Sequence, residues 1–201
     1  VLKPTAGDVI FEGRSMAGQT PSTRLRNGIA RTFQNIRLFG GLTVWQNLWV
    51  ARNSTEDIRS QSILRRWLGS GTALKKEIET MLEFSNLADK ADVLASNLAF
   101  GEQRRLELAR AVAAKPRLLL LDEPAAGMNQ AEVAELEQRI RSLREQGITI
   151  LLVEHVMQLV MGVTDRIAVL NFGSKIAEGS PNDIQENTAV QEAYLGHSDQ
   201  G

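Results

Sequence analysis

The spacing of apolar residues changes along this chain, and the change predicts two kinds of structure. Short apolar runs at residues 29–34 and 118–122 have the length and composition of buried strands. Residues 43–52 and 73–87 instead carry apolar side chains at helical spacing, with a polar, irregular stretch between them. We therefore expect an α-helical insert over residues 40–110, placed between strands.

The N-terminal part carries a further strand-like run and a short helix. Residues 7–13 have strand composition between two glycines. Ser22 or Thr23 is expected to cap a helix that ends before Gly28, because hydroxyl side chains favour the first position of a helix and glycine favours the position after its end.

Beyond residue 110, strand-like and helix-like segments alternate. This order, with continuous apolar strands, favours an α/β fold with a parallel sheet covered by helices on both faces. The expected segments are a helix at 131–145, a strand at 148–154, a helix at 156–161, a strand, turn and strand within 165–179, and two short helices within 180–196.

The chain therefore divides into four parts. We expect N-terminal strands over 1–39, the helical subdomain over 40–110, the core sheet over 111–180 and a helical tail over 181–201.

Composition narrows the possible functions. The 201 residues carry a net charge of −1, which gives no support to nucleic-acid binding. The chain has no cysteine, so disulfides and thiolate metal sites are excluded within it. No signal peptide and no apolar run of membrane-spanning length is visible. Because the chain begins at Val1 and enters a strand-like pattern by Asp8, we expect that its start has been cut.

The segment LLLLDEP, residues 118–124, is the strongest local indication of chemistry. It places Asp122 and Glu123 at the carboxyl end of a buried strand, where parallel sheets bind their ligands. In a nucleoside triphosphatase, such an Asp holds Mg²⁺ and the following Glu orients or deprotonates the attacking water. The same pattern also fits a strand that ends in a solvated acidic turn.

Two further residues follow predicted strands. His155 ends the strand after Asp122, so both strands can end at the same edge of one sheet, where His155 could hydrogen-bond a terminal phosphate. Gln34 ends the strand at 29–34, at the entrance to the helical insert, where it could reach Mg²⁺ and the attacking water. Taken alone, each also fits an ordinary residue at the edge of a sheet.

The segment LAFGEQRRLELARA, residues 98–111, predicts a loop that opens a helix. The free N–H groups at such a helix start favour an anion, although an ordinary capped amphipathic helix fits equally well. We expect a buried stripe of Leu106, Ala109, Val112 and Ala113, with Arg104, Arg105, Glu107 and Arg110 largely in solvent.

Taken together, these segments resemble the nucleotide-binding domain of ATP-binding-cassette (ABC) transporters. Gln34 matches the Gln loop, residues 98–102 the signature, residues 118–122 Walker B, residues 126–129 the D-loop and His155 the switch histidine. Five segments look most like the ATP-binding subunits of branched-chain amino-acid importers: RTFQNIRLF, LAFGEQRRLELARA, LLLLDEPAAGMN, LLVEH and IAEGSP…AYLG. The resemblance implies an α/β P-loop NTPase fold, with a parallel core sheet and an inserted α-helical subdomain, that is truncated at its N-terminus.

The resemblance also implies roles for individual residues. Catalysis is assigned to Glu123, His155 and Gln34, and Mg²⁺ binding to Asp122 and Gln34. The implied ATP-binding residues are Leu98, Ala99, Phe100, Gly101, Glu102, Gln103, Asp122, Gly127 and Asn129.

The implied partners are a second ATP-binding subunit, membrane permease subunits and, through these, a solute-binding protein, with no nucleic acid. In this arrangement the subunit lies peripherally on the cytoplasmic face of the inner membrane. The signature of one subunit faces ATP bound mainly by the other. Leu38, Phe39 and Trp45 are expected to face the permease together with Gln34.

The sequence also departs from the family pattern. Ala99 replaces the signature serine, Phe100 a glycine, and Asn129 the D-loop aspartate. Glu102 places a carboxylate at the helix start, and Val156 stands after His155 where Asp is common.

No GxxxxGK[ST] motif occurs in the sequence. The family places this P-loop roughly forty residues or more before the Gln loop, so we expect it before Val1. The complete protein is then an ATPase that drives amino-acid uptake, and these 201 residues alone are expected to be largely inactive. Two alternatives remain at this point: a soluble ABC ATPase without a membrane partner, and a truncated, non-catalytic interaction module.

Overall fold

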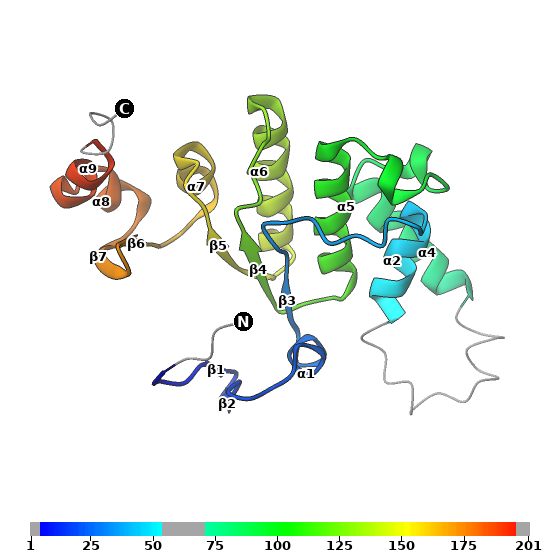
Figure 1. Cartoon of the computed structure of the whole chain (residues 1–201), viewed down its shortest axis with the longest axis horizontal. Helices are drawn as coiled ribbons and strands as arrows, with labels where there is room; N and C mark the ends of the chain where they lie inside the picture. The colour runs from blue at the N-terminus through cyan, green and yellow to red at the C-terminus, as the bar shows by residue number, and fades with distance from the viewer. Residues whose placement is uncertain (1–4, 54–70, 196–201) are drawn as a thin grey trace.

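A parallel three-stranded sheet lies at the centre of the molecule, in a computed structural model that describes residues 5–53 and 71–195 (Figure 1). Its strands are, in order across the sheet, β3 (Ile29–Arg31), β4 (Leu118–Asp122) and β5 (Thr149–Val153). The strands at 118–122 and 149–153 are confirmed. The strand expected at 29–34 is shorter, because pairing with β4 ends at Arg31 and the chain then turns toward the helical insert.

In the described part of the chain, α5 (Phe100–Ala113), α6 (Gln130–Glu145) and α7 (Met157–Val163) contribute buried side chains to the core of this sheet. Figure 1 shows α6 between α5 and α7. Leu119 and Leu121 of β4 are fully buried in the shared core, against Ile140 and Leu143 of α6. Alternate residues of β4 therefore point into this core, as the two-residue repeat of a strand requires.

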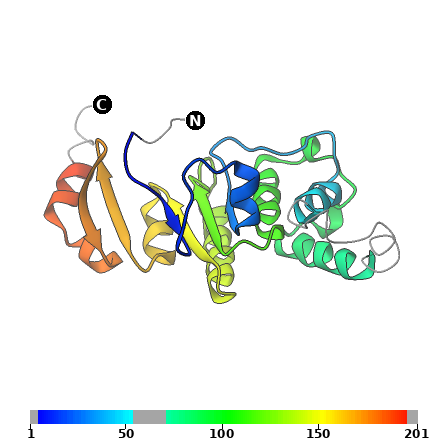
Figure 2. The ribbon, with the colours of Figure 1, turned by 90° about the horizontal axis from the view of Figure 1, so that it is seen from below.

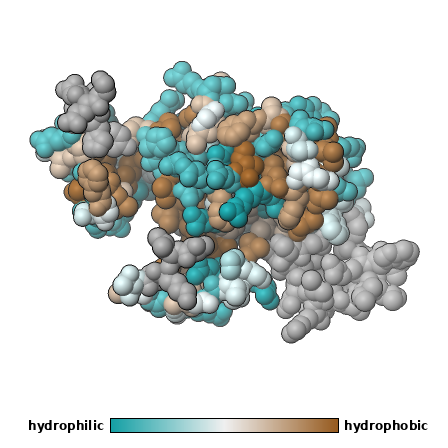
Figure 3. Space-filling view, viewed as in Figure 1, coloured by the Kyte–Doolittle hydropathy of each residue, from teal (hydrophilic) through white to brown (hydrophobic). Residues whose placement is uncertain are grey.

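The opposite face of β5 is not covered, although the sequence predicted helices on both faces. Leu151 and Val153 are each 57% exposed, and among the described residues β5 pairs only with β4. Figure 3 shows brown, hydrophobic patches that interrupt the polar surface along the middle of the molecule. The buried helix residues that pack with this sheet come from α5, α6 and α7, and they share one core with Leu119.

The helical insert builds a second core. α2 (Val44–Asn53) and α4 (Gly71–Phe84) pack against α5, and the buried side chains of this core include Leu48, Ile78 and Leu106. The Thr43 hydroxyl accepts a hydrogen bond from the Gln46 N–H at 3.2 Å and so caps the start of α2. Short 3-10 helices, η1 (Ala88–Lys90) and η2 (Ala95–Asn97), lead back to α5. Most of the polar stretch expected between the helices lies in 54–70, outside the described residues.

The N-terminal segment forms a hairpin followed by a short helix. β1 (Ile10–Phe11) pairs with β2 (Arg14–Ser15) across a turn at Glu12 and Gly13, which both have positive φ. This turn breaks the strand that the sequence predicted over residues 7–13.

The helix that follows is α1 (Pro21–Arg26), and its cap differs from the prediction. The cap is Thr20, whose hydroxyl accepts from the Thr23 N–H, rather than Ser22 or Thr23. Pro21 favours the first helical position, so the helix begins earlier than the hydroxyl pattern indicated. Gly28 follows the helix with a φ of +88°, as expected for a glycine after a helix end.

The C-terminal part forms a separate two-stranded sheet with two helices. β6 (Ile167–Asn171) and β7 (Ser174–Gly179) are antiparallel, and α8 (Pro181–Gln185) and α9 (Thr188–Leu195) follow. Figure 2 shows this part at one end of the elongated molecule and the helical insert at the other. None of the helices in residues 5–53 and 71–195 is long and apolar enough to cross a membrane.

Candidate functional site

The carboxyl end of β4 carries Glu123 in a strained backbone conformation. Its φ is +45°, in the left-handed region that non-glycine residues rarely adopt, at a cost on the order of 1 kcal/mol. The Glu123 N–H donates to the carbonyl of Val153 at 2.9 Å, so β5 holds the turn in place. Such strain is typical of functional positions, where the surrounding structure fixes an otherwise unfavourable geometry.

The structure brings Gln34 to Glu123, although 89 positions separate them in the chain. The Gln34 Nε2–H donates to Glu123 Oε2 at 2.8 Å. This contact is possible because β3, which precedes Gln34, pairs in parallel with β4, which precedes Glu123. We call residues 32–39 the Gln loop.

His155 reaches the same place from the end of β5. Its Nδ1 lies 3.9 Å from Glu123 Oε1, and its side chain is 67% exposed. Gln34, Glu123 and His155 therefore meet at one edge of the sheet, from three adjacent strands. The sequence predicted this juxtaposition, and the exposed imidazole leaves the edge open to a ligand.

Glu154, which the sequence analysis did not single out, organises this edge. Its side chain is fully buried. Its carboxylate accepts backbone hydrogen bonds from Ala125 at 2.9 Å, His155 at 2.7 Å and Val156 at 3.2 Å. One buried carboxylate thus links the turn after Glu123 to the backbone of His155. The signal available in the sequence was an acidic residue next to the histidine, at the end of an apolar strand.

Asp122 is paired with Arg31 of β3, a second residue that the sequence analysis missed. Arg31 Nη2 lies 2.7 Å from Asp122 Oδ2, and the Asp122 side chain is 30% exposed. Within the described residues, no cluster of three or more His, Cys, Asp or Glu side chains could hold a metal. One carboxylate and the Gln34 amide oxygen nevertheless fit Mg²⁺, which takes oxygen ligands and uses few protein groups when phosphates complete its shell.

The predicted signature residues surround the start of α5. Ala99 is the N-cap and has no side-chain oxygen to accept from the first turn, and the Glu102 carboxylate accepts from the Ala99 N–H at 3.0 Å. Glu102 also pairs with Lys90, and the hydrogen bond from Lys90 lowers the pKa of Glu102. The carboxylate that replaces the usual signature residue is therefore bound within the subdomain. Leu98 is buried, and its carbonyl accepts from Gln103 Nε2 at 3.0 Å.

The D-loop packs directly on this helix start. Gly127 has a φ of +76°, and a Cβ there would lie 3.1 Å from the ring of Phe100. A Cβ on Gly101 would likewise meet the Glu132 carboxylate. Asn129 is the N-cap of α6, and its side chain accepts from the backbone N–H groups of residues 131 and 132 at 3.0 Å each. Asparagine therefore keeps the capping role of an aspartate without its charge.

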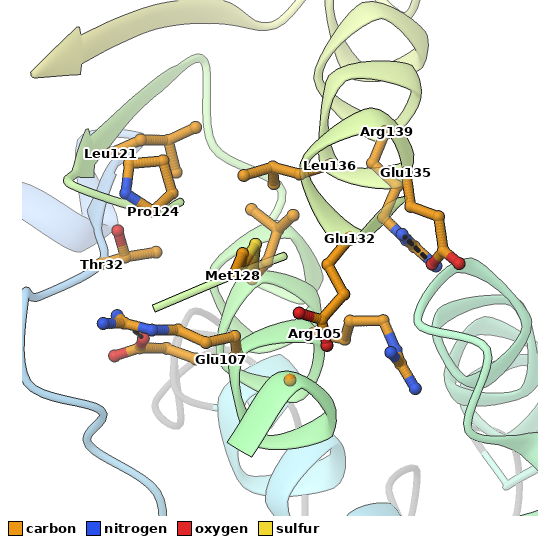
Figure 4. Close-up of a pocket in the computed structure, with 13 residues that line it drawn as sticks. Thr32, Arg105, Glu107, Leu121, Pro124, Met128, Glu132, Glu135, Leu136 and Arg139 are labelled. Carbon is orange, nitrogen blue, oxygen red and sulfur yellow. Dashed lines mark hydrogen bonds and ion pairs between the residues drawn. The ribbon is translucent and has the colours of Figure 1, made fainter. Parts of the chain in front are cut away.

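The charged side of α5 was predicted to lie largely in solvent, and this expectation is wrong. Arg104 and Glu107 are buried, and Arg105 and Arg110 are partly buried. Figure 4 shows Glu107 and Arg105 in a narrow pocket with Thr32, Pro124 and the α6 side chains Glu132 and Arg139. Helical periodicity located the apolar stripe correctly, but it did not reveal that the Gln loop covers the opposite side.

Comparison with known proteins agrees with this arrangement. The ABC transporter family matches residues 1–126, and the branched-chain amino acid ATP-binding cassette transporter family matches residues 174–200. The chain is 42% identical over 200 residues to the high-affinity branched-chain amino acid transport ATP-binding protein LivG of Salmonella typhimurium, covering 98% of this chain and 78% of LivG. It is 40% identical over 203 residues to BraF of Pseudomonas aeruginosa, a protein with the same description, with the same coverage.

Solved structures give the same result. A nucleotide-free ATP-binding cassette from an ABC transporter has a TM-score of 0.78 and 27% identity, covering 96% of this chain and 78% of that chain. The ADP conformation of the ATP-binding cassette MJ1267 also has a TM-score of 0.78 and 27% identity, covering 97% and 79%. These matches confirm the α/β P-loop NTPase fold that the sequence resemblance implied. The chain therefore belongs to the ABC transporter family, as one of its ATP-binding cassettes.

Proposed function

We propose that this chain is the ATP-hydrolysing subunit of an importer for branched-chain amino acids. The observation that carries the proposal is the meeting of Gln34, Glu123 and His155 at one sheet edge, with Glu123 held 2.8 Å from Gln34. The names of LivG and BraF, which describe transport of branched-chain amino acids, support this function over a non-transport ABC ATPase. The intact catalytic edge argues against a non-catalytic module.

Each residue at the edge has a distinct task in this proposal. Glu123 orients the attacking water and accepts its proton, while Gln34 holds the Glu123 carboxylate and contacts the same water. His155 donates a hydrogen bond to the terminal phosphate as charge develops there. Asp122 and Gln34 would hold Mg²⁺, which shields the negative charge of the phosphates.

The proposal assigns the signature and D-loop residues to a second nucleotide. The N–H groups at the start of α5 bind the terminal phosphate of ATP held mainly by a partner ATP-binding subunit. Because Glu102 is already paired with Lys90, the helix start presents backbone N–H groups to this phosphate with little opposing charge. The subunit then works as a pair of cassettes, on the cytoplasmic face of the inner membrane.

The Gln loop and the helical insert provide the proposed contact with the permease. Phe39 is 47% exposed, as this role requires, whereas Leu38 and Trp45 are only partly exposed and pack against the helical core. Phe39 is therefore the better probe of permease docking.

Reconstituted transport tests the proposal. The full-length subunit is assembled with its permease subunits in vesicles, and ATP hydrolysis and uptake of labelled leucine are measured together. We expect ATP-dependent leucine uptake that competing valine reduces and competing lysine does not. Hydrolysis without uptake of any branched-chain amino acid would favour a different ABC ATPase, and absence of hydrolysis would favour the non-catalytic module.

In the same assay, Phe39→Asp is expected to reduce uptake by a larger factor than it reduces ATP hydrolysis. Phe172→Asp is the matched control, since Phe172 is an exposed aromatic residue in the β6–β7 turn. Equal losses of uptake in the two variants would place the permease contact elsewhere.

A further inference from the structure

Three charged side chains of α5 contact the backbone of the Gln loop. They are Arg104, Glu107 and Arg110, which follow one another at three-residue steps and so lie along one side of the helix. All three bind main-chain groups of the loop. We call these three residues the α5 clamp.

Arg104 provides the closest hold on Gln34. Its Nη1 donates to the carbonyl of Phe33 at 3.2 Å, and its Nη2 donates to the carbonyl of Gln34 at 2.7 Å. The side chain is only 6% exposed. The planar fork of the guanidinium suits two neighbouring carbonyls, whereas a lysine ammonium would act as a single point charge.

Glu107 and Arg110 bind the two backbone polar groups of one loop residue, Arg37. Glu107 Oε1 accepts from the Arg37 N–H at 3.2 Å, and Arg110 Nη1 donates to the Arg37 carbonyl. Glu107 Oε2 also lies 3.6 Å from Arg104 Nη1, so the clamp is linked internally. Burial raises the pKa of Glu107, which means that holding this carboxylate in place costs free energy.

Stability alone does not account for such a cluster. Buried ion pairs stabilise proteins weakly, and well-packed apolar residues of similar volume often serve as well or better. Among the described residues, the Nε–H groups of Arg104 and Arg110 are buried without a hydrogen-bond partner. The hydrogen bonds that the clamp does make fix the backbone on both sides of Gln34, whose side chain binds Glu123.

We propose that the α5 clamp positions Gln34 against Glu123 and that Arg104 is the principal positioning residue. The proposal rests on the proposed ATPase function. It also gives a route between two sites, since α5 begins at the signature and its Arg104 binds the backbone of Gln34. A displacement of α5 by nucleotide at its N-terminus moves the Gln loop backbone with it.

A double-mutant cycle in the full-length subunit tests the proposal. Arg104→Met is expected to lower kcat for ATP hydrolysis about tenfold, with KM for ATP within about twofold, as expected for loss of charge-assisted hydrogen bonds that act on turnover. Gln34→Ala removes the side chain through which Arg104 acts. In that background, Arg104→Met should therefore cause little further loss of kcat.

A conservative variant and a matched control separate positioning from general damage. Arg104→Lys keeps the charge but not the fork, and we expect a kcat between those of wild type and Arg104→Met. Arg139→Met is the control, because Arg139 is also largely buried and its Nε donates to a carbonyl, that of Phe84, at 3.1 Å. Its kcat should stay within about twofold of wild type. The proposal is overturned if Arg104→Met lowers kcat by the same factor in the wild-type and Gln34→Ala backgrounds. It is also overturned if Arg104→Met changes only KM.

Amide hydrogen exchange tests, without relying on activity, whether Arg104 holds the backbone of the Gln loop. Arg104→Met and Arg104→Lys should increase exchange at residues 33–37, while Arg139→Met leaves these residues unchanged. Unchanged exchange in the Arg104 variants would overturn the clamp even if their kcat is low. If the wild-type subunit hydrolyses no ATP, the proposed function fails, and exchange at 33–37 still decides whether the clamp holds the loop.

Discussion

The two flanks of the sheet differ sharply in how they are held. On the β3 side, the Gln loop is fixed to α5 by the charged side chains of the α5 clamp, and Arg104 is 6% exposed. On the β5 side, Leu151 and Val153 are more than half exposed, and β6 is not hydrogen-bonded to β5 in the described part of the chain. Glu123 lies between them, bound to Gln34 on one side and to the β5 backbone on the other.

The two flanks fix the backbone next to Gln34 and next to His155 in different ways. The β3 flank holds the backbone of Gln34, for which we propose a catalytic role, through a buried polar network that is costly and geometrically specific. The β5 flank leaves His155 in solvent and anchors its backbone through the single buried carboxylate of Glu154. The two flanks therefore differ in what fixes the backbone at the edge: side chains of α5 on the β3 flank, and one carboxylate next to His155 on the β5 flank.

The largest effect is expected where the flanks meet. Glu123→Gln in the full-length subunit should lower ATP turnover about a thousandfold, since an amide cannot accept a proton from water, while nucleotide binding changes little. Steady-state hydrolysis and a nucleotide titration measure both quantities. Glu145→Gln, an exposed carboxylate on α6, is the control. Turnover near the wild-type rate would remove Glu123 from the mechanism.

A second prediction compares the covered and open faces of neighbouring strands. Leu119→Ala should lower the free energy of unfolding by about 3 kcal/mol, because Leu119 is fully buried and its truncation leaves a cavity. Leu151→Ala, on the exposed face of β5, should cost less than about 1 kcal/mol. Denaturant titrations of both variants give the comparison. Equal costs would mean that the β5 face is covered in solution.

The third prediction concerns the anchor of the β5 flank. Glu154→Ala should cost about 2 kcal/mol of unfolding free energy, because three backbone N–H groups lose their buried acceptor. Thermal or denaturant unfolding measures the loss, with Glu145→Ala as a control that removes an exposed carboxylate. Amide exchange at His155 and Val156 should also rise. A free energy of unfolding equal to that of the control would show that water accepts these three hydrogen bonds as well as Glu154 does.

The smallest effect is a pH dependence inside the α5 clamp. The folded state raises the pKa of Glu107, so it retains this proton at pH values where the unfolded chain has lost it. Wild-type stability from this group therefore falls as pH rises through and above the usual glutamate range. Glu107→Gln has no carboxylate to ionise at this position. Its free energy of unfolding relative to wild type should therefore increase as pH rises through and above the usual glutamate range.

Glu102 gives the control with the opposite sign. Its folded pKa is lowered by the hydrogen bond from Lys90, so its contribution is present above the usual glutamate range and is lost as pH falls through the folded pKa. The stability of Glu102→Gln relative to wild type should therefore decrease as pH rises. Unfolding curves of both variants at several pH values measure the slopes. Slopes of the same sign would contradict the assigned environments.

The sequence predicted those parts of the fold and site that depend on local pattern. Apolar runs located β4 and β5, and motif order brought Gln34, Glu123 and His155 to one edge. The boundaries of β3 and the start of α1 were wrong, because pairing partners and Pro21 set them rather than composition.

The parts that escaped prediction depend on contacts between distant segments. Arg104 contacts carbonyls 70 and 71 positions earlier in the chain, and Arg31 pairs with an aspartate 91 positions later. Helical periodicity assigned the charged side of α5 to solvent, because periodicity describes one helix and cannot reveal a loop packed across it. Glu154 was missed for a related reason: its contact with the backbone N–H of Ala125, 29 positions earlier, exists only once the turn after β4 lies beside β5.

The parallel pairing of β3 with β4 also has a consequence for biosynthesis. β3 has only three residues, and its partner strand is translated after the whole helical insert. At ribosomal rates of about 5–20 residues per second, the 89 positions between Gln34 and Glu123 correspond to a delay of roughly 5–20 s between the synthesis of β3 and that of β4. The free-energy cost of closing so long a loop depends only weakly on its length, because each doubling of the length adds about 0.6 kcal/mol. Insertions or deletions within the helical insert should therefore alter the length of this delay more than the stability of the finished sheet.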